Sequence, residues 1–86
     1  METQTIERTA LSNLIYNEDY TRKVLPFIKG NYFEVREERI IFEEIFNFVD
    51  KYKKIPTQTS LEIEVGERKD LSEIEYKKVV DIIKTL

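Results

Sequence analysis

Apolar residues recur along most of the chain at spacings of three and four, which is the period of an amphipathic α-helix. The longest run of this pattern lies in GNYFEVREERIIFEEIFNFVDKYKKIPT, a stretch that contains four of the five phenylalanines. The pattern predicts an all-α fold, a compact orthogonal bundle of about five helices. The helices are expected from Thr3 to Tyr16, from Glu18 to Leu25 with a kink at Pro26, from Glu34 to Lys53, from Thr59 to Val65 and from Ser72 to Leu86.

The apolar face of the third predicted helix is broad. It covers close to half of the circumference, wider than the stripe of an ordinary surface helix. It consists of Ile41, Ile45, Phe48, Val49 and Tyr52, flanked by Phe42 and Phe46. Such a face could form the centre of the core or be kept for a partner. In a compact helical domain this helix would be central and touch several neighbours, so we expect its main arc to lie in the core.

A contact surface for a partner should then come from apolar residues that lie outside this arc. The candidates are Ile40, Ile55, Ile63 and Ile74. Isolated exposed apolar residues are common, so each of the four could equally be a surface residue without a partner. Charged residues around such positions would tune the choice of partner and the rate of association more than the affinity.

The first predicted helix has an apolar face formed by Ile6, Ala10, Leu11, Leu14 and Ile15. Glu7 falls inside this arc. Because it lies in the first turn, we interpret it as a residue that compensates the helix dipole and not as a buried acid. In the second predicted helix Tyr20 and Val24 should face the core, and Phe27 and Ile28 should pack on the domain as a short added turn.

The stretch TSLEIEV is compatible with two kinds of secondary structure. Leu61, Ile63 and Val65 alternate with acidic residues, which is the period of a half-buried strand. The residues from Thr59 to Glu62 instead fit a helical capping box. Since no second segment reads as a pairing strand, we predict a short helix. A second capping box, from Ser72 to Glu75, predicts the start of the last helix.

Composition limits the chemistry that the chain can perform. Hydrophobic residues at 41% and charged residues at 36% favour a single folded helical domain over residues 1–86, not a disordered chain. The absence of His and Cys excludes thiolate metal sites and nucleophile–imidazole pairs. Neighbouring acids such as Glu37 and Glu38 point in different directions on a helix. We therefore expect no catalytic residues, no metal and no cofactor in this chain.

Charge and hydropathy indicate where such a chain works. The net charge is −3, and the one dense basic run, Lys51, Lys53 and Lys54, lies where a helix should end. These lysines could complement the helix dipole or contact phosphate, and the first role is the more common one. No apolar run resembles a signal peptide or a membrane span, which predicts a cytoplasmic protein without a membrane partner.

Three stretches resemble the N-terminal domain of DnaB-type replicative helicases, in particular the primase-interacting helicase of T-even-like phages. They are LSNLIYNEDYTRKVLPFI, NYFEVREERIIFEEIFNFVDKYKKIPT, and TSLEIEV followed by LSEIEYKKVVDIIKTL. The first stretch resembles the two opening helices of that domain, including the proline late in the second helix. The second stretch resembles the long third helix and its Tyr/Phe-Phe pair. The third stretch, made of two segments, resembles the final short and long helices.

The resemblance implies a helical collar on one side of a hexameric ring, a homo-oligomer that docks primase or a helicase loader. ATP and Mg would bind a RecA-like domain after Leu86. The chain would then be the N-terminal fragment of a longer helicase, and DNA would be contacted only through that parent protein. The helical hairpin that helps to pair collar domains in cellular helicases is missing here. A phage-encoded protein would work in the host cytoplasm.

Two other hypotheses remain from the sequence. One is the helicase-binding domain of a primase, which is built on a similar helical plan but would follow a catalytic region, whereas Met1 resembles a true start. The other is a small helical DNA-binding regulator. Its recognition helix should expose basic and amide side chains, yet the outward residues here are mostly Glu mixed with Lys.

Overall fold

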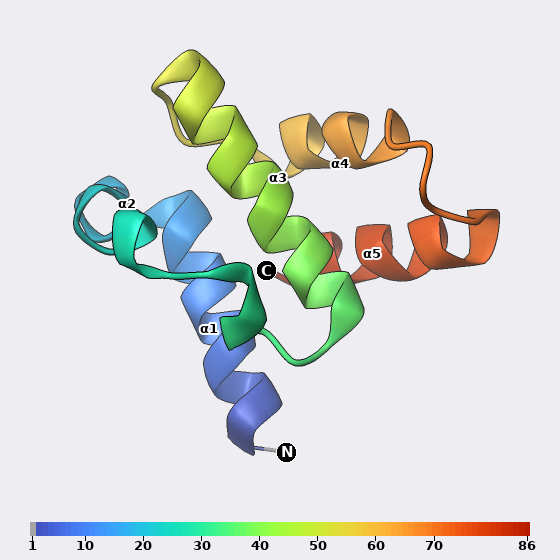
Figure 1. Ribbon diagram of the computed structural model, residues 1–86, viewed down its shortest axis with the longest axis horizontal. Coiled ribbons are helices and arrows are strands. Elements are labelled where there is room, and N and C mark those ends of the chain that lie inside the picture. Colours follow the sequence, from blue (N-terminus) through green and yellow to red (C-terminus); the bar gives the residue numbers. More distant parts are fainter. Residues whose placement is uncertain (1) are drawn as a thin grey trace.

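The computed structural model describes residues 2–86, and it is helical throughout (Figure 1). Its elements are α1 (Glu2–Tyr16), α2 (Glu18–Val24), the 3₁₀ turns η1 (Leu25–Phe27) and η2 (Gly30–Tyr32), α3 (Arg36–Tyr52), α4 (Gln58–Gly66) and α5 (Glu73–Thr85). No strand occurs in this range, which confirms the predicted all-α fold and the helix predicted for TSLEIEV. Across residues 2–86, every helix is too short or too polar to cross a membrane.

Helix α3 runs through the middle of the molecule. The α1–α2 hairpin lies on one side of it and the α4–α5 pair on the other (Figure 1). The most deeply buried apolar side chains come from all three layers: Leu11, Leu14, Phe33, Ile41, Ile45, Leu61, Val65, Val79 and Ile83. Because α3 packs against α1, α4 and α5 at once, its position requires the broad apolar face that the sequence predicts.

Burial along α3 nevertheless differs from the predicted arc. Ile41 and Ile45 are buried as expected, but Phe48 is only half-buried and Tyr52 is 45% exposed. The reason is that the last turns of α3 extend past the neighbouring helices (Figure 1). Ile40, which was expected to be exposed, is only 3% exposed. The first half of α3 is enclosed by α1, α4, α5 and η2, so even this off-arc side chain is covered.

The segment after α2 breaks at Pro26, as predicted. Pro26 lies at the start of η1, where its missing N–H is not needed for helical hydrogen bonding. Leu25 is buried in this turn, whereas Phe27 is 83% exposed, so the expectation that Phe27 packs on the domain is wrong. A 3₁₀ turn has about three residues per turn, and the proline break directs Leu25 inward while Phe27 faces solvent.

In α1 and α2, two polar residues, Glu7 and Thr21, are buried. Ile6 is exposed and Glu7 is buried, so the interpretation of Glu7 as an unburied dipole residue is wrong. Thr21 on α2 is buried as well. Its hydroxyl donates to the backbone oxygen of Leu14 at 2.6 Å, which joins α2 to α1. Buried polar groups are tolerated when they are hydrogen-bonded in this way.

The ends of α4 and α5 show which capping signals are used. Ser72 and Glu75 form the predicted capping box: each accepts the other's backbone N–H through its side chain, at 3.1 Å in both directions. The predicted box at Thr59 is not used. Helix α4 begins earlier, because the side chain of Thr57 accepts the backbone N–H of Ser60 at 3.0 Å.

Arg68 fastens the α4–α5 connection to α3. Its guanidinium donates to Asp70 through two nitrogens, at 2.9 and 3.0 Å, and to the largely buried Glu44 on α3 at 2.7 Å. Glu43 lies 3.2 Å from the same group. Burial raises the pKa of Glu44, and the Arg68 hydrogen bond opposes that rise. Arg68 therefore provides the positive charge that offsets the burial of the Glu44 carboxyl group.

Replacement of Arg68 should destabilise the domain strongly. We expect Arg68→Ala to lower the free energy of unfolding by about 3 kcal/mol, because it leaves Glu44 buried without its cation. Arg36→Ala is the control: it removes an ion pair with Glu75 at 3.1 Å on the surface and should change stability little. Urea denaturation followed by circular dichroism measures both. Equal losses would show that the Arg68 contact is an ordinary surface pair.

The uneven burial of α3 predicts a contrast between two truncations. Ile40→Ala should lower the free energy of unfolding by about 3 kcal/mol, because it opens a cavity in the enclosed half of the helix. Phe48→Ala removes a larger side chain but should cost only about 1 kcal/mol, since that ring already meets solvent. Thermal or urea unfolding of the two variants tests this order. A larger loss for Phe48→Ala would place the end of α3 inside the core.

Candidate functional site

The structure separates the four isoleucines that the sequence suggested as partner contacts. Ile40 is buried and cannot touch a partner while the domain is folded. Ile55 is half-buried against the core and lies beside α2. Ile63 on α4 and Ile74 in the first turn of α5 are both exposed. A partner contact through Ile63 and Ile74 therefore stays a prediction, whereas Ile40 is no longer a candidate contact.

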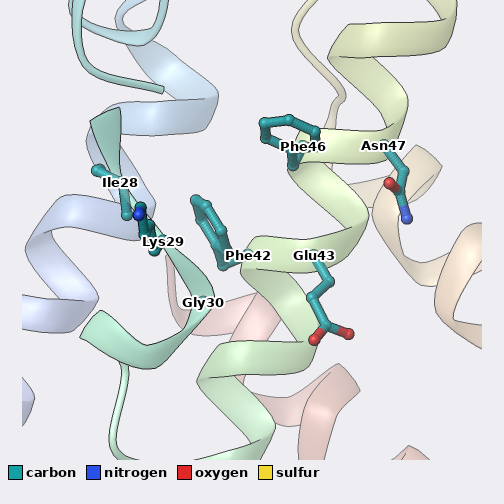
Figure 2. Close-up of a pocket in the computed structure, with 7 residues that line it drawn as sticks. All are labelled: Ile28, Lys29, Gly30, Phe42, Glu43, Phe46 and Asn47. Atoms are coloured by element: carbon teal, nitrogen blue, oxygen red, sulfur yellow. The ribbon is translucent and has the colours of Figure 1, made fainter. Parts of the chain in front are cut away.

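A groove lies between α3 and the linker that joins η1 to η2. We call it the α3 groove, and it has a volume of about 440 Å³. Its lining consists of Ile28, Lys29, Gly30, Phe42, Glu43, Phe46 and Asn47. Figure 2 shows Phe42 lying between the linker and α3, with Phe46 one turn further along the helix and Ile28 on the opposite wall.

The aromatic side chains of the α3 groove are continuous with the core. Phe33 is fully buried, and its ring centroid lies 5.2 Å from that of Phe42. The centroid of Phe42 lies 6.3 Å from that of Phe46, which is 41% exposed. Residues four apart share a helix face, so Phe42 and Phe46 form one wall. The exposed ring of Phe46 thus packs on the buried ring of Phe42, which in turn packs on Phe33.

The lining of the α3 groove includes one lysine. Phe27, which precedes the groove residue Ile28 in sequence and is not part of the lining, is the most exposed of the large apolar residues in the described chain. Lys29 is exposed and forms no ion pair with the side chains that the structure describes, those of residues 6–86. Glu43, by contrast, is already paired with Arg68. The groove therefore combines aromatic side chains with an exposed positive charge.

The lining of the α3 groove is mainly aromatic and aliphatic. It offers phenyl rings, an aliphatic side chain, an ammonium group, an amide and the Glu43 carboxylate, which is paired with Arg68. Within the part of the chain that the structure describes, acidic residues do not gather into a group that could hold a metal ion. Small, well-supported aromatic patches are the kind of surface that anchors protein partners.

From the sequence pattern, Phe42 and Phe46 were expected only to flank the apolar face of the third helix. The groove itself was not predicted. Their spacing of four was a visible signal for a shared face. The opposite wall, formed by Ile28 and Lys29, was not predictable from spacing, because it depends on how the linker after Pro26 folds back along α3. A groove between two segments is a tertiary feature.

Comparison with known proteins identifies the relatives of this chain. The sequence model of the family described as the DnaB-like helicase N-terminal domain matches residues 1–85. The DnaB-like replicative helicase of Enterobacteria phage T4 is 32% identical over 76 residues, which is 88% of this chain and 16% of that helicase. The chain thus matches about a sixth of the relative's length. No solved structure matches significantly. The family match and the helical fold together confirm the predicted resemblance: the chain belongs to the family of DnaB-like helicase N-terminal domains.

Proposed function

We propose that this chain is the non-catalytic, N-terminal interaction domain of a phage-type replicative DNA helicase. In this role it docks primase or a helicase loader and supports assembly of the hexameric ring. ATP and Mg bind another part of the longer parent chain, and DNA is contacted through that parent in the host cytoplasm. The family match supports the helicase assignment, and it favours this over a primase domain or a DNA-binding regulator.

The observation that carries the docking role is the α3 groove. Phe46 is a large, exposed side chain that packs against Phe42, which in turn packs against the buried Phe33, so its binding would cost little conformational entropy. Such rigid aromatic anchors are typical hot spots of protein interfaces. Lys29 adds a cation at the rim that can choose between partners by charge. We place the docked partner in this groove.

Docking in the α3 groove predicts that Phe46→Asp weakens binding of purified cognate primase or loader at least tenfold. The physical reason is that a charged side chain would replace the apolar anchor in a desolvated contact. Tyr52→Asp is the matched control, because Tyr52 is an aromatic residue of the same helix with similar exposure outside the groove. Isothermal titration calorimetry measures both affinities, and circular dichroism should show the wild-type helix content in both variants.

The exposed isoleucines provide the competing surface in the same assay. Ile63→Glu and Ile74→Glu keep all groove residues intact and alter α4 and α5. Loss of binding in these variants, with wild-type affinity for Phe46→Asp, would move the docking surface away from the α3 groove. Wild-type affinity in all three variants, for primase and loader alike, would refute docking of these partners through either surface.

A further inference from the structure

A second, smaller cleft lies between α2 and the loop that follows α3. It has a volume of about 140 Å³ and shares no lining residue with the α3 groove. Three cations line it, Arg22 from α2 and Lys53 and Lys54 from the loop, and we call it the lysine cleft. Because Arg22 is distant from the two lysines in sequence, only the fold brings these positive charges together.

The charges of the lysine cleft are unevenly compensated. Nε of Arg22 donates to the Glu18 carboxylate at 2.9 Å, so this pair is close to neutral. Lys53 and Lys54 are exposed and form no ion pair with any side chain that the structure describes. The negative end of the α3 dipole favours a cation in the last turn, where Lys51 already lies. The lysines of the cleft therefore add positive charge that is left for a ligand.

The backbone holds Lys53 in a conformation that suits another residue type. Lys53 has φ 58° and ψ 30°, in the left-handed region, and within the described chain it is the one non-glycine residue with a positive φ. Glycine is the usual residue at this end of a helix, because a side chain is strained there. Strained residues concentrate at sites that bind ligands. A lysine at this position thus points to a role for its ammonium group.

Apolar side chains form the inner part of the lysine cleft. Val49 on α3 and Ile55 in the loop are half-buried and pack against the core. A space of about 140 Å³ is close to the cavity of about 150 Å³ that holds benzene, so it can admit one apolar side chain. Valine and isoleucine offer no hydrogen-bond donor to a phosphate group, and the net charge of −3 opposes a long polyanion. The cleft therefore fits a protein segment better than a nucleic acid.

We propose that the lysine cleft binds an acidic protein segment that carries one apolar side chain. This side chain packs on Val49 and Ile55, and carboxylates next to it in the segment pair with Lys53 and Lys54. Opposite charges also raise the rate of association. The inference goes beyond the docking role proposed above, because the cleft is a second surface and leaves the α3 groove free for primase or loader.

The first test is an NMR titration of the ¹⁵N-labelled 86-residue chain with the peptide Asp-Asp-Asp-Leu-Asp-Asp-Asp. We expect it to shift the backbone amide signals of Val49, Lys53, Lys54 and Ile55. A peptide with alanine in place of the leucine should bind about fivefold more weakly, because it buries less apolar surface. Added salt should weaken both peptides, since it screens the charges. Absence of shifts at these residues, or equal affinities for the two peptides, would overturn the proposal.

The second test removes the two lysines. Lys53→Gly and Lys54→Gln should each weaken binding of the leucine peptide about threefold, and together about tenfold, because two exposed ion pairs are lost. Glycine suits the left-handed conformation, so Lys53→Gly should melt close to the wild-type temperature. Lys29→Gln is the matched control, since it removes an equally exposed lysine from the α3 groove. Wild-type affinity in the double variant, or an equal loss in the control, would refute the proposal.

A single-stranded nucleic acid is the competing ligand for such lysines. Fluorescence anisotropy of a fluorescein-labelled oligothymidylate, at the same salt concentration, compares it with the leucine peptide. We expect the oligonucleotide to bind more weakly than the peptide. Tighter binding of the oligonucleotide that also depends on Lys53 and Lys54 would assign the cleft to phosphate and overturn the proposal. The titrations of the wild-type chain decide the matter even if a variant fails to fold.

Discussion

The packing of α3 against three other helices is the constraint on which the rest of the domain depends. A chain of 86 residues can bury only about 60% of the surface that its unfolded form exposes. One central helix that packs against α1, α4 and α5 uses this limited apolar area efficiently, and its residues Ile41 and Ile45 are fully buried. The enclosure also covers Ile40, and it leaves Phe48 and Tyr52 near the far end of α3 partly exposed.

Ion pairs between charged side chains add contacts between helices to those of the small apolar core. Arg68 joins the α4–α5 connection to Glu44 on α3, and Arg8 joins α1 to Glu38 on the opposite side. Both carboxylates are buried, so their desolvation has to be balanced by a cation or a proton. The two sides differ in this respect. Arg68 pairs with three acids, Glu43, Glu44 and Asp70, whereas the more exposed Arg8 pairs with Glu38.

The same arrangement provides a rigid surface for a partner. Phe33 fills the core beneath the linker, and Phe42 and Phe46 carry that aromatic packing outward along α3. A groove built in this way needs little reorganisation on binding. The chain belongs to the DnaB-like helicase N-terminal family. The docking role that we propose for the α3 groove connects this family membership with the groove.

Local signals in the sequence determined the helical fold, because they act between residues that are close in the chain. The Ser72–Glu75 capping box, the break at Pro26 and the three-to-four spacing each specify backbone conformation over one or two turns. The depth of each side chain was decided only by tertiary structure. Glu7 and Phe27 illustrate this, since a buried acid and an exposed ring both contradict hydropathy. Burial depends on which distant segments pack alongside, and the spacing within one helix carries no information about those neighbours.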